Sequence, residues 1–351
     1  MRMIRVVAQL MAPMVVLALG ASTAQADPDP NLTVTAARII RTTPVTVSSL
    51  NTVPVTVEVD AKYTWPEADP NTTLHGIFVR SAGTGQLRYL FTTELKRYSG
   101  TTQNGKWRGT VNVPSTANGQ FQLTGVMVGP YWPGSDGMTD PTPVPSPPTL
   151  TVVGTNLPKI TARIIPDPVP FGQGYSIRWS VINSQTAKPY GTRLRVALAN
   201  DSACVESYGS SNALTDTNGY VTKSYPASMA GALNCLLLPN IPSPSGWLSI
   251  GINRPGIVSA TPAKTSAPVG SIVTVNGTVL GAPTGCPVYL QRLYGATAWR
   301  SVGTAKVRQG SGRFELYAQP AYKGYIPYRV SFPACYNFRA GVSKTFTIRG
   351  I

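Results

Sequence analysis

Apolar and polar residues alternate with a period of two through much of the chain, most clearly toward its C-terminal end. Val273, Val275 and Val279 are separated by polar residues and a glycine. Successive side chains of a β-strand point to opposite faces, so this alternation predicts half-buried strands with the apolar residues inside. The same spacing recurs in four further pairs: Val288/Leu290, Phe314/Leu316, Val330/Phe332 and Phe346/Ile348.

Proline and glycine interrupt the alternation throughout the sequence. The 351 residues include 32 prolines and 33 glycines, while charged residues make up 13% and apolar residues 42%. Proline breaks helices and both residues mark turns, so this composition predicts an all-β protein built from many short strands. The apolar share is large enough for packed cores, which excludes a disordered chain.

A turn, an aromatic residue and a later proline recur three times, and each copy ends in a proline-rich loop and a short alternating strand. Three units of roughly 95–130 residues, each with about seven strand-like stretches, are typical of β-sandwiches. We therefore expect domains at 27–157, 158–256 and 257–351. The turns are 104–107, 218–220 and 311–314, the closing strands 150–153, 247–250 and 346–348, and the first two units open alike at 35–40 and 161–165.

Residues 1–26 have the pattern of a secretory signal peptide. Arg2 and Arg5 precede an apolar run over residues 6–19, and small residues at 24–26 stand before Asp27. The run is shorter than a membrane span. We expect this segment to be removed and the mature protein to be secreted, free or non-covalently associated with the cell wall.

Because thiols pair outside the cytoplasm, export predicts that the cysteines form disulfides. The chain has four, and four cysteines allow three connectivities. We predict the bonds Cys204–Cys235 and Cys286–Cys335, since the boundary near residue 256 then falls between the two pairs. No C-x-x-C motif is present and the chain has one histidine, so we predict no metal site and no cofactor.

The third unit resembles a known family. Residues 270–277, 287–292, 299–302, 312–314 and 328–330 are similar to the bacterial immunoglobulin-like repeats of secreted actinobacterial proteins. The resemblance covers about the last 95 residues, and the first two units follow it in outline. It implies three consecutive immunoglobulin-like β-sandwiches in an extracellular setting, and it brings no catalytic residue because the family shares none.

Charge is distributed unevenly along the chain. Residues 27–157 hold nine basic and nine acidic side chains, and residues 158–256 hold eight and four. Residues 257–351 hold eleven basic side chains and a single acid, Glu315. Such a gradient predicts that the third domain engages an anionic partner.

Alternation predicts where these cations point. With Val330 and Ile348 inside the sandwich, Arg329 and Arg349 point outward, and Lys306 does so on another strand. We expect these three to share a sheet face, while Arg313 lies on the opposite sheet as an internal control. The predicted polyanion-binding residues are Arg292, Arg300, Lys306, Arg329 and Arg349, with Arg300 and Arg292 at strand ends.

A loop over residues 129–137 suggests a second kind of site. Tyr131 and Trp132 can stack on a sugar ring and Asp136 can hydrogen-bond to it, unless the rings fold back over the sandwich. His75 lies in a strand-like run with no nucleophile motif nearby. The carboxylate pairs Glu67/Asp69 and Asp136/Asp140 match neither a calcium-loop consensus nor a glycosidase arrangement with its required companions, so we predict that the protein is not an enzyme.

Three functions fit the sequence. The leading hypothesis is a non-catalytic binding protein that engages an anionic envelope polymer, an acidic glycan or, without sequence specificity, nucleic acid. The second is an adhesin-like spacer that binds another protein. The third is a glycan-binding module centred on the loop with Tyr131.

The leader pattern yields a direct test. Mass spectrometry of the secreted form should show a mature N-terminus at Asp27, because small residues at 24 and 26 direct cleavage there. Recovery of the intact leader on the secreted protein would contradict this expectation.

Overall fold

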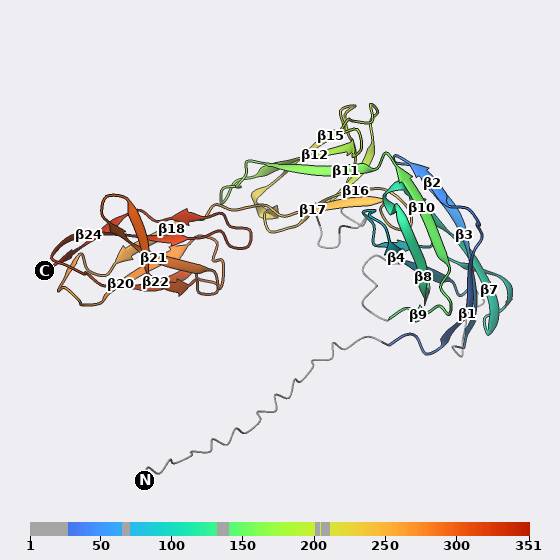
Figure 1. Ribbon diagram of the computed structural model, residues 1–351, viewed down its shortest axis with the longest axis horizontal. Helices are drawn as coiled ribbons and strands as arrows, with labels where there is room; N and C mark the ends of the chain where they lie inside the picture. The colour runs from blue at the N-terminus through green and yellow to red at the C-terminus, as the bar shows by residue number, and fades with distance from the viewer. Residues whose placement is uncertain (1–26, 65–70, 132–139, 201–203, 205–210) are drawn as a thin grey trace, which may run out of the picture.

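The protein consists of three consecutive β-sandwiches, as the ribbon in Figure 1 shows. The structure is a computed structural model and describes residues 27–64, 71–131, 140–200, 204 and 211–351. The predicted leader, Glu67/Asp69, Trp132 and Asp136 lie outside the described residues. Within these ranges nearly every element is a strand, which confirms the predicted fold class, and none is a helix long and apolar enough to cross a membrane.

Domain 1 packs a four-stranded sheet against a larger one. The first sheet has the order β1-β3-β7-β6, with β1 (Leu32–Ile39), β3 (Thr52–Tyr63), β7 (Asn104–Pro114) and β6 (Lys96–Thr101). The second has the order β2-β10-β8-β4-β5, with β2 (Val45–Ser48), β10 (Thr149–Thr155), β8 (Gly119–Val128), β4 (Leu74–Ala82) and β5 (Tyr89–Phe91), and β9 (Thr142–Pro143) pairs with β8.

Domain 2 is smaller. Its first sheet has the order β11-β12-β15, with β11 (Pro158–Ile165), β12 (Tyr175–Asn183) and β15 (Tyr220–Tyr225). Its second has the order β14-β13-β16-β17, with β14 (Ser211–Leu214), β13 (Arg195–Ala199), β16 (Asn234–Leu238) and β17 (Gly246–Ile250). Short 3-10 turns follow the prolines that end β7 and follow β15, at Ser115–Ala117 and Ala227–Met229.

Domain 3 repeats the plan of domain 1. Its first sheet has the order β18-β20-β23, with β18 (Val258–Pro262), β20 (Val273–Val279) and β23 (Arg313–Ala318). Its second has the order β19-β26-β24-β21-β22, with β19 (Ser266–Ala267), β26 (Phe346–Gly350), β24 (Gly324–Phe332), β21 (Pro287–Tyr294) and β22 (Ala298–Lys306), and β25 (Gly341–Val342) pairs with β24.

The sequence repeat corresponds to equivalent strands. The three recurring turns lead into β7, β15 and β23, each of which is third in the spatial order of strands in the first sheet of its domain. The closing strands are β10, β17 and β26. A turn residue with positive φ is present in two of the three turns, at Gly219 and Gly312, which is why glycine recurs there.

Each core contains a large aromatic side chain that is fully buried between the two sheets: Trp107 in domain 1, Trp179 in domain 2 and Tyr328 in domain 3. The polar atoms of two of them have partners, since Trp107 Nε1 donates to Thr72 O at 3.2 Å and Tyr328 OH to Gln319 O at 3.0 Å. Burial of a side chain of this size removes roughly 150–250 Å² from water.

Both disulfides join the cysteines that the sequence analysis paired. Cys204–Cys235 lies on the outer side of the second sheet of domain 2, and Cys286–Cys335 joins the start of β21 to the loop after β24 in domain 3. The bridged residues are 31 and 49 positions apart in sequence, respectively.

Direct contacts hold the domains together. At the first junction Gln86 Nε2 donates to Pro158 O at 2.8 Å, and the hydroxyl of Thr116 donates to Ser245 O. At the second, Arg254 Nη1 donates to Pro170 O at 2.8 Å, and its backbone bridges to Phe338 in the loop that Cys335 anchors. The linkers are therefore bonded to both neighbours.

The position of the disulfides predicts an unequal response to reduction. Closing loops of these lengths contributes about 3–4 kcal/mol each in the chain-entropy model. Dithiothreitol should therefore lower the free energy of unfolding of domains 2 and 3 and leave domain 1 unchanged. Amide hydrogen exchange with domain-resolved peptides measures this, and equal loss of protection in β3 and β7 would contradict it.

Candidate functional site

The outer face of the second sheet of domain 3 carries three of the predicted cations. Cross-strand partners share a face of a sheet. Arg349 on β26 lies opposite Tyr325 on β24, which is 72% exposed, and Lys306 on β22 lies opposite Pro287. Arg329 on β24 alternates with buried Tyr328 and Val330 and therefore shares the outer face. We call this the outer face of domain 3.

Aromatic rings accompany two of these guanidinium groups. The Arg329 guanidinium carbon lies 4.3 Å from the ring centroid of Trp299 on β22, and Arg349 lies 5.7 Å from that of Tyr325. Arg329 Nε also donates to Gln291 Oε1 at 2.8 Å. A cation over an aromatic face gains about 0.5–1 kcal/mol at an exposed site, and it keeps its hydrogen-bond donors available to a ligand.

No carboxylate side chain lies on this sheet. Glu315, the single acid of residues 257–351, is on β23 in the opposite sheet. There it accepts a hydrogen bond from Tyr317 OH at 2.6 Å and lies 3.8 Å from Arg308. Arg313 is on the same strand, so the predicted control residue is also on the opposite sheet. The cations of the outer face therefore have no carboxylate side chain on their own sheet to neutralise them.

In domain 1, by contrast, two arginines are paired with carboxylates. On the outer side of its first sheet, Arg38 Nη2 lies 2.8 Å from Asp60 Oδ1, and Arg108 Nε donates to Glu58 Oε1 at 2.8 Å. Burial raises the pKa of Glu58, but the hydrogen bond and charge of Arg108 outweigh it and hold the pKa below its ordinary value. The hydrogen bond from Arg38 likewise lowers the pKa of Asp60. These two arginines of domain 1 are thus neutralised by neighbouring carboxylates.

Arg292 and Arg300 are placed away from the outer face. Arg292 lies opposite Tyr328, which is fully buried, and Arg300 lies opposite Arg292, so both belong to the inner side of the sheet at its far end. Their guanidinium groups lie 4.3 and 5.0 Å from the ring of Tyr294. The expectation that they join the other cations fails geometrically, because strand alternation puts them on the other side.

The aromatic loop of domain 1 folds back on its own sandwich as far as it is described. Tyr131 stacks on Phe91 with centroids 4.0 Å apart and meets the edge of His75 at 6.1 Å. His75 is buried, and its Nδ1 is 2.8 Å from Gly129 O. One face of the Tyr131 ring is therefore covered. Trp132 and Asp136, the other residues of the predicted glycan site, lie outside the described residues.

The described ranges offer few side chains arranged for catalysis or for metal binding. They contain no group of three or more histidine, cysteine or acidic side chains placed to hold a metal ion. Asp140 lines a cavity of about 550 Å³ together with Asp27 and Asp29. Asp29 Oδ1 is already used by the Asn31 backbone N–H at 2.9 Å, as in an ordinary turn.

Sequence reasoning missed the aromatic partners of the outer face. Tyr325 lies four residues before Arg329, so alternation alone places both on one face. Trp299 is different, because a bulge where Gln291 follows Leu290 shifts the β21–β22 register. No pattern in the sequence reveals which residue of β22 then faces Arg329.

No protein-family model matches this chain, and no curated protein matches it. Among solved structures it is similar to the adhesin FdeC of Escherichia coli, with 12% identity over 91% of this chain and 98% of that one, at a TM-score of 0.28. The complex of Dpr2 Ig1-Ig2 with DIP-Theta Ig1-Ig3 gives 8% identity, 90% and 99% coverage and a TM-score of 0.23. Similarity at this level gives no information on what the chain binds.

The ion pairs of domain 1 predict acid sensitivity. The pKa values of Glu58 and Asp60 are lower in the folded state than their ordinary values of 4.5 and 3.8. Their stabilisation is therefore complete above the unfolded values and is lost as the pH falls through the folded ones. In Glu58→Gln, the unfolding free energy of domain 1 should depend less on pH below about pH 4.5. Exposed Glu94→Gln is the control, and an unchanged slope in Glu58→Gln would refute the assignment.

Proposed function

We propose that the protein is an exported, non-catalytic binding protein whose outer face of domain 3 holds a linear anionic polymer. The observation that carries the proposal is the set of Lys306, Arg329 and Arg349 on one sheet face with no carboxylate on that sheet. The leader pattern and two disulfides support an extracellular setting. The resemblance of domain 3 to bacterial immunoglobulin-like repeats is part of the same proposal.

The spacing of the cations favours a polymer over a small anion. Arg349 lies one strand from β24 at the level of Tyr325, four residues from Arg329, which corresponds to about 14 Å between the two cations. Lys306 lies two strands from Arg329 and four residues along β21, a separation of about 16 Å. The three cations form a diagonal about 30 Å long. A single phosphate or carboxylate reaches one of them, whereas a chain with repeated charges reaches all three.

Binding at such a face is multivalent and depends on salt. Each exposed contact contributes about 0–1 kcal/mol, so affinity arises from the sum over several repeats. The exposed ring of Tyr325 and the partly exposed ring of Trp299 add flat surfaces between the charges. Guanidinium groups suit phosphate and carboxylate oxygens, which they bind through two parallel hydrogen bonds. This combination fits a phosphate-rich wall polymer or an acidic glycan.

The other two hypotheses have less support on this molecule. A spacer that binds another protein agrees with the row of sandwiches, but it leaves the unpaired charge of domain 3 without a role. A glycan site on domain 1 needs the ring of Tyr131, one face of which stacks on Phe91.

A triple substitution tests the polymer proposal. Lys306→Gln, Arg329→Gln and Arg349→Gln together should reduce binding to long-chain polyphosphate and to alginate by at least about tenfold at low salt, because three charge contacts are removed. Wild-type binding should weaken steeply as salt rises toward about 1 M, where the Debye length is near 3 Å. Fluorescence anisotropy of labelled polymer measures both.

The matched control removes the same net charge elsewhere. Lys188→Gln, Arg308→Gln and Arg313→Gln together leave the outer face of domain 3 intact, and this variant should bind within about twofold of wild type. Equal loss in both triple variants would show that net charge alone is responsible. Unchanged binding in the first variant would refute the proposal directly.

A further inference from the structure

The two junctions between domains follow one plan. At the first, Leu50, on the loop between β2 and β3 of domain 1, packs on the core of domain 2. At the second, Phe171, on the equivalent loop before β12 of domain 2, has its ring centroid 6.4 Å from that of Phe338 in domain 3 and also lies against Gly281. In both cases a large apolar residue, on the loop that precedes the second strand of the first sheet, contacts the next domain.

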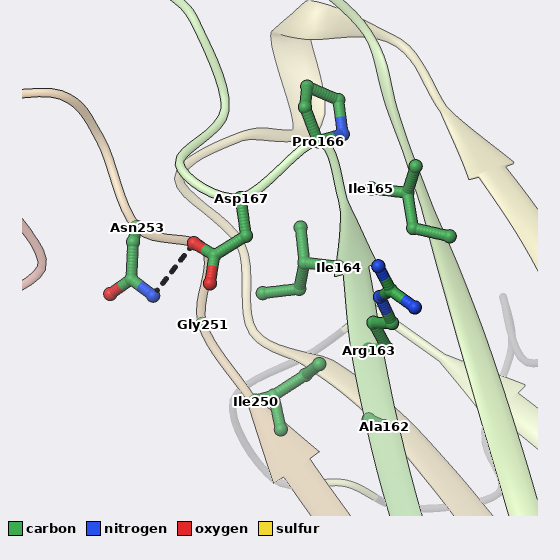
Figure 2. A pocket seen from close by; sticks show the side chains of 9 residues that line it. All are labelled: Ala162, Arg163, Ile164, Ile165, Pro166, Asp167, Ile250, Gly251 and Asn253. Carbon is green, nitrogen blue, oxygen red and sulfur yellow. Dashed lines mark hydrogen bonds between the residues drawn. The ribbon is translucent and has the colours of Figure 1, made fainter.

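A polar contact borders the second junction. Asp167 Oδ1 accepts a hydrogen bond from Asn253 Nδ2 of its own domain at 3.1 Å, as Figure 2 shows. The other carboxylate oxygen, Oδ2, accepts one from Arg339 Nη2 of domain 3 at 3.0 Å. An apolar contact with an ion pair beside it therefore joins one domain to the next.

The equivalent surface of domain 3 is uncovered. The loop between β19 and β20 carries Val269 and Ile272, which are both exposed, Ile272 to 72%. Exposed Tyr322 lies on the neighbouring loop between β23 and β24, and a hydrogen bond from Gly270 N–H to Pro320 O at 2.9 Å joins the two loops. Figure 1 shows this end of domain 3 beside the C-terminus, away from domain 2. We call residues 268–272 and 320–323 the tip of domain 3.

The tip is basic as well as apolar. Lys323 is exposed beside Tyr322, and exposed Arg349 lies opposite Tyr325, two residues farther along the chain. No acidic side chain belongs to the tip, because Glu315 is the single acid of residues 257–351. Contiguous exposed apolar side chains with a polar rim are typical of a contact surface.

A complementary surface lies on domain 1. Its cavity of about 550 Å³ is at the end away from domain 2, where β1 begins and β3 and β8 end. Tyr63, Val126 and Val128 are among its lining residues. The position is that of the surface that receives Phe171, because Gly281 and Phe338 follow β20 and β24, which correspond to β3 and β8.

Carboxylates surround this cavity. Asp27, Asp29 and Asp140 line it, and none of its lining residues is basic. The neighbouring Lys62 is exposed and alternates with Tyr63, so it points to the other side of β3. Cleavage before Asp27 would add one α-amino charge, which the three carboxylates outweigh. The cavity is therefore an acidic counterpart of the basic tip.

We propose that the tip of domain 3 docks into this cavity on a second copy of the chain, so that copies associate head to tail. Ile272 would make the contact that Leu50 and Phe171 make within the chain, and Lys323 would meet the carboxylates at the rim. Two basic tips repel each other, which disfavours a tip-to-tip dimer. Because the two surfaces differ, the contact is heterologous and leaves a tip and a cavity free at the ends of each growing assembly.

Sedimentation velocity of the full disulfide-bonded chain at low salt tests the proposal. A contact of this size is weak, so the sedimentation coefficient should rise between about 10 μM and about 1 mM. The double variant Ile272→Gln with Lys323→Gln should associate at least about tenfold more weakly, because it removes the apolar contact and the cation of the tip. No polymer is present, so the outcome is independent of the proposed function.

A matched control makes the same changes elsewhere. Leu214→Gln with Lys159→Gln alters two exposed positions of domain 2 and should associate like wild type. A wild-type chain that stays monomeric throughout this range, or equal loss in both double variants, would overturn the proposal.

Mixing two defective variants tests the head-to-tail geometry. Pro30→Lys with Asp140→Lys places two cations at the rim of the cavity and leaves the tip intact. This variant and the tip variant should each associate weakly alone, whereas their equimolar mixture should form dimers, because the intact tip of one meets the intact cavity of the other. All four positions are partly or fully exposed, so the variants keep the fold, and equal melting temperatures verify this. A mixture that associates no better than its components would show that the contact is not head to tail.

Discussion

The burial of one large aromatic side chain between two sheets is the interaction on which each domain depends. Trp107, Trp179 and Tyr328 come from different strands of their sandwiches, yet each is fully buried between the sheets. The surrounding strands alternate valine, isoleucine and leucine inward, and this inward set forces the remaining residues outward. The outer face of domain 3 is a consequence of this alternation.

The fold could be predicted well from the sequence because the fold depends on local signals. Period-two alternation identifies strands, and a recurring turn before an aromatic residue marks the same strand in each unit. The position of Arg329 and Arg349 outside the sandwich follows from Val330 and Ile348 inside it. These inferences need no knowledge of which strands are neighbours.

Features that depend on strand register could be predicted less well from the sequence. Arg292 and Arg300 look like further members of the basic face, but their partners across β21, β22 and β24 place them on the inner side. The contact of Trp299 with Arg329 requires the bulge after Leu290.

The domains also differ in how they balance charge. Domain 1 pairs Arg38 and Arg108 with the carboxylates of Asp60 and Glu58, which fixes these two guanidinium groups in place and neutralises them. Domain 3 places four guanidinium groups over aromatic rings, two of them on its outer face, which holds them without neutralising them. An aromatic partner therefore preserves a positive potential that an acidic partner cancels.

The disulfide Cys286–Cys335 has a mechanical consequence for a chain under tension. The bond joins residues 49 positions apart, so a pulling force passes through it and bypasses everything between. At roughly 3.3–3.6 Å per extended residue, about 160 Å of chain in β21 to β24 cannot be drawn out while the bond is intact. Domain 1 has no such bond and can extend over its whole length. Lys306, Trp299 and Arg329 all lie inside the locked segment, so most of the outer face of domain 3 would keep its chain connectivity under a load that unravels domain 1.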